Sequence, residues 1–197
     1  MVFTRTYNPP KILDRVAAAG HTVFATGEHN ANIIGVRTAS RVPGAFDDWM
    51  HLVWQVKEKW EHYRWPITTD PGLYWLENPM NVDGTAILAP GQYRGAYRIG
   101  KHRDDYQAVV QTGGEVAVYR DDDRNALLDP TGDLFWGYFG INHHRASALL
   151  DGSKQVGKWS AGCQVFADPD DFAEYLRLVK ITTSMYGLSV TYTLLSD

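Results

Sequence analysis

The sequence predicts a mainly β, β-sandwich-like fold with a short helix near the N-terminus and one longer helix near the C-terminus. Short runs of β-branched and aromatic residues, separated by turn residues, recur from Asn32 to Leu195. Near the end of the chain, one segment that follows Asp168 has the apolar spacing of an amphipathic helix. A chain of 197 residues, 44% of them hydrophobic, is long enough to fold as one domain around a full core.

The first 29 residues are predicted to form a helical extension, and residues 30–197 the main domain. Asn8 suits the N-cap of a helix, and the two prolines after it are tolerated in the first turn. Gly20 suits the C-terminal stop of the same helix. Its apolar face is predicted to consist of Ile12, Leu13, Val16 and Ala17.

Several short strands are predicted in the first half of the main domain. Trp49–Val56 is apolar and favours a strand, although helix is a competing interpretation because Lys57–His62 continues without a breaker. A turn is indicated at Ile67–Gly72, where Asp, Pro and Gly follow one another. The other strands predicted here are Ile33–Val36, Leu73–Leu76, Thr85–Leu88 and Ala96–Ile99.

A β-hairpin is the clearest local prediction for the middle of the chain. Tyr106–Gln111 and Glu115–Arg120 carry strand-forming residues, and Thr112-Gly113-Gly114 joins them. The run Asp121–Asp123 closes the second strand of this hairpin. We interpret the run as a solvated turn, because we find neither the alternating ligands nor the glycine of a calcium loop there.

The last third of the chain carries the best-defined helix. Asp168 suits its N-cap, Pro169 its first position and Gly187 its end. Leu188–Leu195 alternates between apolar and polar residues and is predicted as the final strand. The other elements predicted here are a strand at Phe135–Asn142 and a loop or lid at Ala146–Lys154.

Composition and charge argue against several classes of protein. A net charge of −4 and a pI near 5.9 are unlike those of a nucleic-acid-binding protein. No apolar run approaches the roughly 20 residues of a membrane span. A single cysteine excludes a disulfide framework within the chain. We therefore expect a monomer with no cofactor, metal, nucleic-acid or membrane partner, which is synthesised in the cytoplasm without a signal peptide.

The only cysteine, Cys163, lies in the stretch V-G-K-W-S-A-G-C-Q-V, with Gly162 directly before it and Ser160 three residues before it. Cysteine catalysis needs a thiolate, a base that forms it and backbone N–H groups that hold the oxyanion. A glycine at position 162 lets a substrate approach the backbone closely. The alternative is that Cys163 is a small buried hydrophobe. We expect a nucleophile for an acyl or peptide bond, with a lowered thiol pKa and fast alkylation near neutral pH.

Two neighbouring histidines, His143 and His144, are candidates for the base. In a strand, His143 would share the apolar face of Ile141, and His144 would lie on the opposite face. We therefore favour His144 as the base that accepts the thiol proton. The alternatives are that His143 is the base, or that the pair binds a metal although the His-Glu-x-x-His spacing is absent. His102 is interpreted as a solvated turn residue, with a place beside the site as the alternative.

The order of a histidine, a loop and then Gly157-Lys158-x-Ser160-x-Gly162-Cys163 resembles the catalytic signature of the L,D-transpeptidase (YkuD-type) family. Upstream, Thr68–Tyr74 is similar to the Thr-Pro-x-Gly-x-Phe segment of that family. The resemblance covers about Asn32 to Leu195. The chain departs from the family pattern in three places: Ala161 replaces a second histidine, Val165 an Arg or Asn, and Arg145 a glycine.

The resemblance implies a catalytic main domain that attacks peptidoglycan stem peptides through a thioacyl-enzyme. It implies Cys163 as the nucleophile and His144 as the base. It also implies that the N–H groups of Gly162 and Cys163 hold the oxyanion and that Ser160 shapes the turn. The residues expected to contact the substrate are His102, His143, Arg145, Trp159 and Gln164.

The resemblance leaves the second half of the reaction open. Water as the acceptor gives hydrolysis, whereas an amine gives a cross-link. The altered residues around the cysteine and the missing export signal favour hydrolysis by a lysin-like or toxin-like peptidase, which acts at the bacterial cell wall after delivery or release. The alternatives are an L,D-transpeptidase that forms cross-links or exchanges D-amino acids, a metal-dependent hydrolase, and a non-catalytic wall-binding module.

Overall fold

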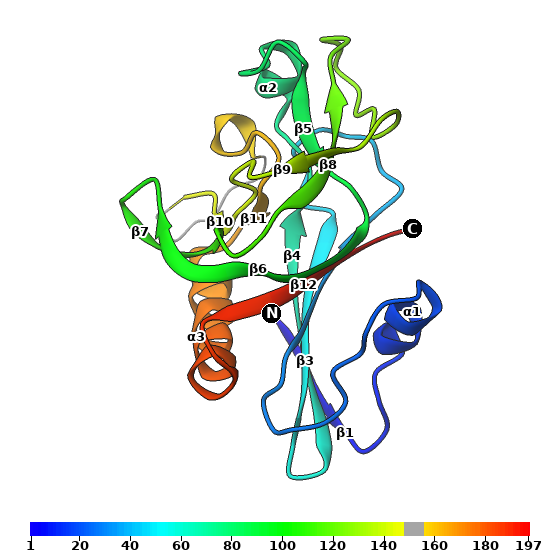
Figure 1. Ribbon diagram of the computed structural model, residues 1–197, viewed down its shortest axis with the longest axis vertical. Helices are drawn as coiled ribbons and strands as arrows, with labels where there is room; N and C mark the ends of the chain where they lie inside the picture. Colours follow the sequence, from blue (N-terminus) through cyan, green and yellow to red (C-terminus); the bar gives the residue numbers. More distant parts are fainter. Residues whose placement is uncertain (148–155) are drawn as a thin grey trace.

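The computed structural model describes residues 1–147 and 156–197, apart from the side chain of Trp159. It confirms the mainly β fold with a longer helix near the C-terminus (Figure 1). The strands are β1 Val2–Thr6, β2 Asn32–Arg37, β3 Asp48–Val56, β4 Lys59–Thr68, β5 Thr85–Leu88, β6 Gly91–His102, β7 Tyr106–Gln111, β8 Val116–Asp121, β9 Phe135–Gly137, β10 His143–Arg145, β11 Gln164–Phe166 and β12 Ser189–Ser196.

In the described part of the chain, nine strands form one large sheet in the order β1-β4-β11-β10-β7-β6-β12-β2-β3. Because β3 also pairs with β4, the strands from β4 to β3 close into a ring, and β1 extends it as an added edge. Most neighbours are antiparallel, but β10 with β11 and β12 with β2 are parallel pairs. A second sheet, β5-β8-β9, lies above one end of the ring in Figure 1.

Three α-helices and one 3₁₀ turn accompany the sheets in the described residues. These are α1 Ile12–Ala18, α2 Leu73–Glu77, the 3₁₀ turn η1 Gly157–Trp159, and α3 Pro169–Tyr186. The carboxylate of Asp168 caps α3 by accepting the N–H of Asp170, and Gly187 follows the helix with a φ of 97°. Helix α1 starts later than predicted, because Lys11 occupies the N-cap position and Asn8 does not cap it.

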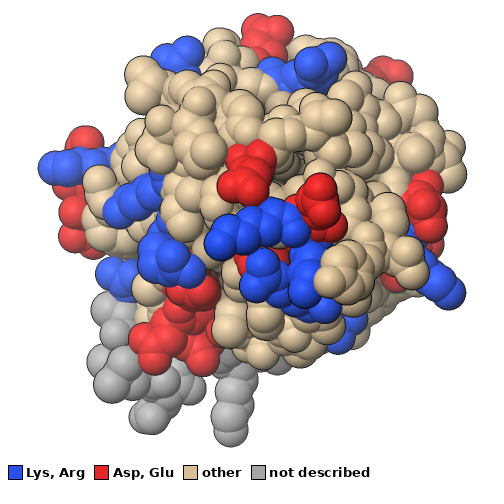
Figure 2. All heavy atoms as spheres, turned by 90° about the horizontal axis from the view of Figure 1, so that it is seen from below, with Lys and Arg blue, Asp and Glu red and all other residues tan. Residues whose placement is uncertain are grey.

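Charged residues of both signs are interspersed on the face of the molecule that Figure 2 shows. Lysine and arginine side chains lie next to aspartate and glutamate side chains there, so no patch of a single sign covers this face. None of the described helices is long and apolar enough to cross a membrane.

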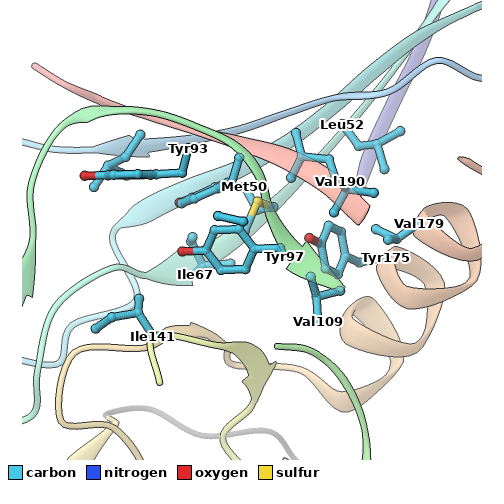
Figure 3. Packing of buried hydrophobic residues seen from close by; sticks show 14 of the residues in the cluster. Met50, Leu52, Ile67, Tyr93, Tyr97, Val109, Ile141, Tyr175, Val179 and Val190 are labelled. Atoms are coloured by element: carbon cyan, nitrogen blue, oxygen red, sulfur yellow. The ribbon is translucent and has the colours of Figure 1, made fainter. Parts of the chain in front are cut away.

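The main core fills the space between the ring of strands and helix α3. Figure 3 shows Met50 from β3, Tyr97 from β6 and Tyr175 from α3 converging in it. A smaller cluster covers the other face of β2 and β3, where α1 packs Ile12, Leu13 and Val16 onto the sheet. The strand β1 and helix α1 therefore join the extension of residues 1–29 to the main sheet.

Two local predictions are wrong. Leu73–Leu76 belongs to helix α2, and the predicted hairpin of Tyr106–Gln111 with Glu115–Arg120 does not form. Instead, β7 pairs with β6 in the large sheet, whereas β8 pairs with β5 and β9 in the small sheet. The Gly113 N–H donates to the carbonyl of Ala96, so the turn between β7 and β8 moves the chain from one sheet to the other.

Other boundaries differ in length. Trp49–Val56 is a strand, as predicted, and it turns at Lys57 and Glu58, both with positive φ, into β4, which was not predicted. The predicted strand Phe135–Asn142 is reduced to β9, and most of the lid predicted at Ala146–Lys154 lies outside the described residues.

Candidate active site

The cysteine lies on a short loop that leads into β11. Ser160 is 1% exposed, and its Oγ accepts the N–H groups of Gly162 at 3.0 Å and Cys163 at 2.7 Å. The same hydroxyl donates to the carbonyl of Cys163 at 3.3 Å. Ser160 therefore holds the turn, and it occupies both N–H groups that the resemblance implies as oxyanion donors.

Gly162 is required by the fold itself. Its φ is 120°, and a Cβ there would clash with the backbone oxygen of Ala86 in β5. We expected a substrate to approach the backbone closely at this glycine, but the neighbour that does so is β5 of the small sheet. Any larger residue would push the loop of Cys163 away from β5.

The thiol of Cys163 is half-buried and already has two backbone partners. It donates to the carbonyl of Gly140 at 3.3 Å and accepts the N–H of Asn142 at 3.4 Å. Burial raises the pKa of Cys163 to about 11, although the Asn142 N–H and the charge of Arg103 act in the opposite direction. The expected lowering of the thiol pKa is therefore wrong for the resting state, in which the sulfur is protonated.

The two histidines of β10 point to opposite faces of the strand, as alternation predicts. His143 is fully buried in the core, where its Nδ1 hydrogen-bonds the Tyr175 hydroxyl at 2.6 Å and its ring contacts those of Tyr97 and Tyr192. Burial lowers the pKa of His143 to about 3. The structure therefore places His143 away from any substrate.

His144 faces the other way and has the tautomer of a base. Its Nδ1 lies 2.9 Å from the carbonyl of Arg145, which can only accept, so this nitrogen carries the proton and Nε2 carries the lone pair. Among the described residues, no partner hydrogen-bonds Nε2. Burial, followed by the charge of His102, lowers the pKa of His144 to about 3, so the ring is neutral.

The strand register places the loop of the cysteine beside the strand of His144. In the parallel pair of β10 and β11, His144 lies opposite Val165, and Cys163 is two residues before Val165. Hydrogen bonds from the Asn142 N–H to Cys163 Sγ and from the Gln164 N–H to the Asn142 carbonyl place Cys163 beside Asn142, which is two residues before His144. We expected a direct hydrogen bond, but none joins the sulfur to an imidazole among the described residues.

Two polar residues that the sequence analysis missed, Gln111 and Asn142, position the site together with His102. The Gln111 N–H donates to Asn142 Oδ1 at 2.9 Å, which leaves the Asn142 amide nitrogen to donate to His102 Nδ1 at 3.2 Å. His102 in turn stacks on His144. His102 is only 8% exposed, so it is a buried neighbour of His144 and not a solvated turn residue.

Gln111 also fixes the loop that carries Gly140, whose carbonyl accepts the hydrogen bond of the Cys163 thiol. Its Oε1 accepts the backbone N–H groups of Phe139, Gly140 and Ile141 at 2.9 to 3.2 Å. Its Nε2 donates to the carbonyls of Gly114 and Gly137. No local sequence signal reveals this role, because every partner except Gly114 lies more than 20 residues away.

A cavity of about 260 Å³ opens beside His144. Arg145 lines it with its guanidinium 4.1 Å from the centre of the Tyr106 ring, and the Tyr106 hydroxyl donates to the Arg145 carbonyl. Arg103 adds a second positive charge and Asp105 a negative one. A second cavity, of about 280 Å³, is lined by Phe139 and Ala161. Because Ala161 is two residues before Cys163, this cavity lies beside the first part of the cysteine loop.

Two further predicted contacts are not brought to these cavities. Gln164 is fully buried, and its Oε1 accepts the Tyr192 hydroxyl at 2.7 Å in the core. It follows Cys163 directly as the first residue of β11, and its side chain points into the core. The side chain of Trp159 lies outside the part that the structure describes.

The upstream segment Thr68–Tyr74 packs against the loop of the cysteine. Thr68 lies opposite Val165 in the pair of β4 and β11. The Gly72 N–H donates to the carbonyl of Ser160 at 3.0 Å, and a Cβ on Gly72 would clash with the carbonyl of Gly157. The two stretches that carry the sequence resemblance are therefore neighbours in space.

Comparisons of the chain with protein-family models, with curated proteins and with solved structures give no match. The candidate site therefore rests on its own geometry: a cysteine on the loop directly before β11 and a neutral histidine on the neighbouring strand β10, with a cavity beside the histidine.

Proposed function

We propose that the protein is a cysteine peptidase that hydrolyses stem-peptide or cross-link bonds of peptidoglycan through a thioacyl-enzyme. The observation that carries the proposal is the register of β10 and β11, which places Cys163 beside Asn142, two residues from His144, whose Nε2 has no hydrogen-bond partner among the described residues. The peptidoglycan substrate comes from the sequence resemblance, whose two stretches lie side by side.

The resting site is a neutral thiol and a neutral imidazole. Catalysis therefore requires the proton to pass from Cys163 to His144 when the substrate binds, and hydrogen bonds of this kind often tighten only in the complex. The Asn142 N–H, which already points at the sulfur, stabilises the thiolate as it forms. Cys163 lines neither the cavity of His144 nor that of Ala161, so a substrate would have to bridge the two cavities to reach the sulfur.

Digestion of purified sacculi, followed by mass spectrometry of the released fragments, tests this proposal. Wild-type protein should release fragments that have gained one water for each bond broken. Cys163→Ala and His144→Gln should abolish release, whereas His21→Gln, outside the site, should retain it. Full activity of Cys163→Ala would disprove the proposal.

Transpeptidation uses the same two residues and differs only in the acceptor. A free D-amino acid added to the digest distinguishes the two activities. A fragment that carries the added amino acid indicates exchange, and its absence beside hydrolysed fragments indicates a peptidase.

A non-catalytic wall-binding module is the second candidate. The raised thiol pKa and the missing bond between Cys163 and His144 favour it. It predicts that the protein sediments with sacculi equally well before and after alkylation of Cys163, and that no fragments are released at any pH.

A further inference from the structure

Asp121, at the end of β8, is a buried carboxylate with an unused oxygen. It is 2% exposed, so the interpretation of Asp121–Asp123 as a solvated turn is wrong for its first residue. One oxygen, Oδ2, accepts the N–H of Asp129 at 2.9 Å. The other, Oδ1, has no hydrogen-bond partner among the described residues. A buried acceptor without a donor is costly unless a ligand satisfies it.

Asp121 lines a cavity of about 540 Å³ whose walls are strongly acidic. No ion pair within the described part of the chain joins these carboxylates to a lysine or arginine. The one arginine in the wall, Arg120, donates to the carbonyl of Gly84 and lies over the Phe139 ring. The aspartates that line the cavity are Asp83, Asp121, Asp122, Asp123, Asp129 and Asp133.

The oxygen-bearing residues of this loop alternate in the sequence once Asn125 and Asp129 are included, so the absence of alternating ligands that we inferred from Asp121–Asp123 alone is wrong for the longer loop. Asp121, Asp123 and Asn125 are each two residues apart, and Asp129 follows at the ninth position counted from Asp121. Calcium loops take ligands from positions 1, 3, 5, 7 and 9, with a backbone carbonyl at position 7, which is Leu127 here. The glycine that such loops have at position 6 is replaced by alanine, and the bidentate glutamate that they have at position 12 is replaced by Gly132, so the match covers the first nine positions.

We propose that this loop, residues 121–129, binds a calcium ion, with Asp121 Oδ1 as its buried ligand. Calcium takes six to eight oxygen ligands in a flexible geometry, so carboxylates, the Asn125 amide oxygen, the Leu127 carbonyl and water suit it. In the described residues, no three acidic, histidine or cysteine side chains are already gathered as a metal site. Asp123 and Asn125, which now hydrogen-bond each other at the surface, therefore turn inward when the ion binds.

Calorimetric titration of the chelator-treated full chain with calcium chloride tests the proposal, with thermal unfolding as a second measurement. Wild-type protein should show saturable binding with a dissociation constant below about 1 mM and a higher melting temperature with calcium. Asp123→Asn should weaken binding by about tenfold or more. Asp121→Asn should also weaken calcium binding by about tenfold or more. If this buried variant does not fold, the variant at the exposed Asp123 still tests the proposal.

Asp122→Asn is the matched control. It removes the same charge from the same cavity, but at a position that falls between the alternating ligands. Calcium affinity of this variant should stay within about threefold of wild type. Equal weakening by Asp122→Asn and Asp123→Asn would mean diffuse attraction by negative charge and would overturn the proposal, as would the absence of saturable binding to wild-type protein.

Discussion

His102 lies stacked on His144, with ring centroids 4.2 Å apart and an interplanar angle of 20°. The stack fixes the plane of His144, while the Arg145 carbonyl fixes its tautomer. Asn142 connects the pair to the thiol, because its amide nitrogen donates to His102 and its backbone N–H donates to Cys163 Sγ. Burial disfavours a charge on His144, and a charge on either ring disfavours a charge on the other, so burial and the stack together keep His144 neutral in the resting site.

Alkylation of Cys163 should be slow in the native protein. A thiol pKa of about 11, against an ordinary value of 9.0, reduces the thiolate at pH 7 by about 100-fold. Labelling by iodoacetamide, followed by mass spectrometry, should therefore be about 100-fold slower in buffer than in urea. His144→Gln should leave the native rate unchanged, because His144 does not hydrogen-bond the sulfur. Labelling at pH 7 that is as fast in buffer as in urea would contradict the structure.

Replacement of Gln111 should destabilise the loop that carries Gly140. Gln111→Met keeps the length of the side chain but leaves three backbone N–H groups without their acceptor. We expect a loss of about 3 kcal/mol in the free energy of unfolding, measured with urea. Gln107→Met, at an exposed position of the same strand, should cost less than about 0.5 kcal/mol. Similar losses for the two variants would show that the Gln111 bonds do not hold the loop.

Stability should fall as the pH is lowered from 7.5 to 5. His51 Nδ1 and His62 Nε2 are 2.8 Å apart, and mainly through burial the pKa of His51 is lowered to about 3 and that of His62 to about 4. Below pH 6.5 the unfolded chain binds protons that the native pair does not, so unfolding becomes more favourable until the native pKa values are reached.

The histidine pair should account for roughly 2 to 3 kcal/mol of the loss in unfolding free energy between pH 7.5 and pH 5. Urea unfolding at the two pH values measures this loss. In the double variant His51→Gln/His62→Gln, the loss should be smaller by about that amount. An unchanged loss in the double variant would assign the pH dependence to other groups, such as His143 and His144.

The sequence predicts elements whose signals are local. Helix α3 is an example. Its ends are marked by residues next to them in the sequence, namely Asp168 and Pro169 at the start and Gly187 at the end. Leu73–Leu76 is too short an apolar run for its periodicity to separate strand from helix. The false hairpin at Thr112-Gly113-Gly114 has a correct turn composition, but β8 finds its partners in β5 and β9, which no local pattern specifies.

The same limit applies to the candidate site. Strand alternation separates His144 from His143 correctly, since both lie in one short strand. Gln111 and Asn142 were not found, because their partners lie far away along the chain. The engagement of the Gly162 and Cys163 N–H groups by Ser160 could not be foreseen either, since it depends on how the loop is held against β5 and the Gly72 turn.

The place of β12 between β6 and β2 has a consequence for biosynthesis. It pairs Tyr192 with Ile33 of β2 and with Tyr93 of β6, so the ring cannot close until a strand that begins 87 residues after the end of β6 has been synthesised. A nascent chain that stops before Ser189 has two open strand edges beside uncovered aromatic residues. Open strand edges beside apolar side chains favour aggregation, so a chain truncated before Ser189 should aggregate where the full ring stays folded.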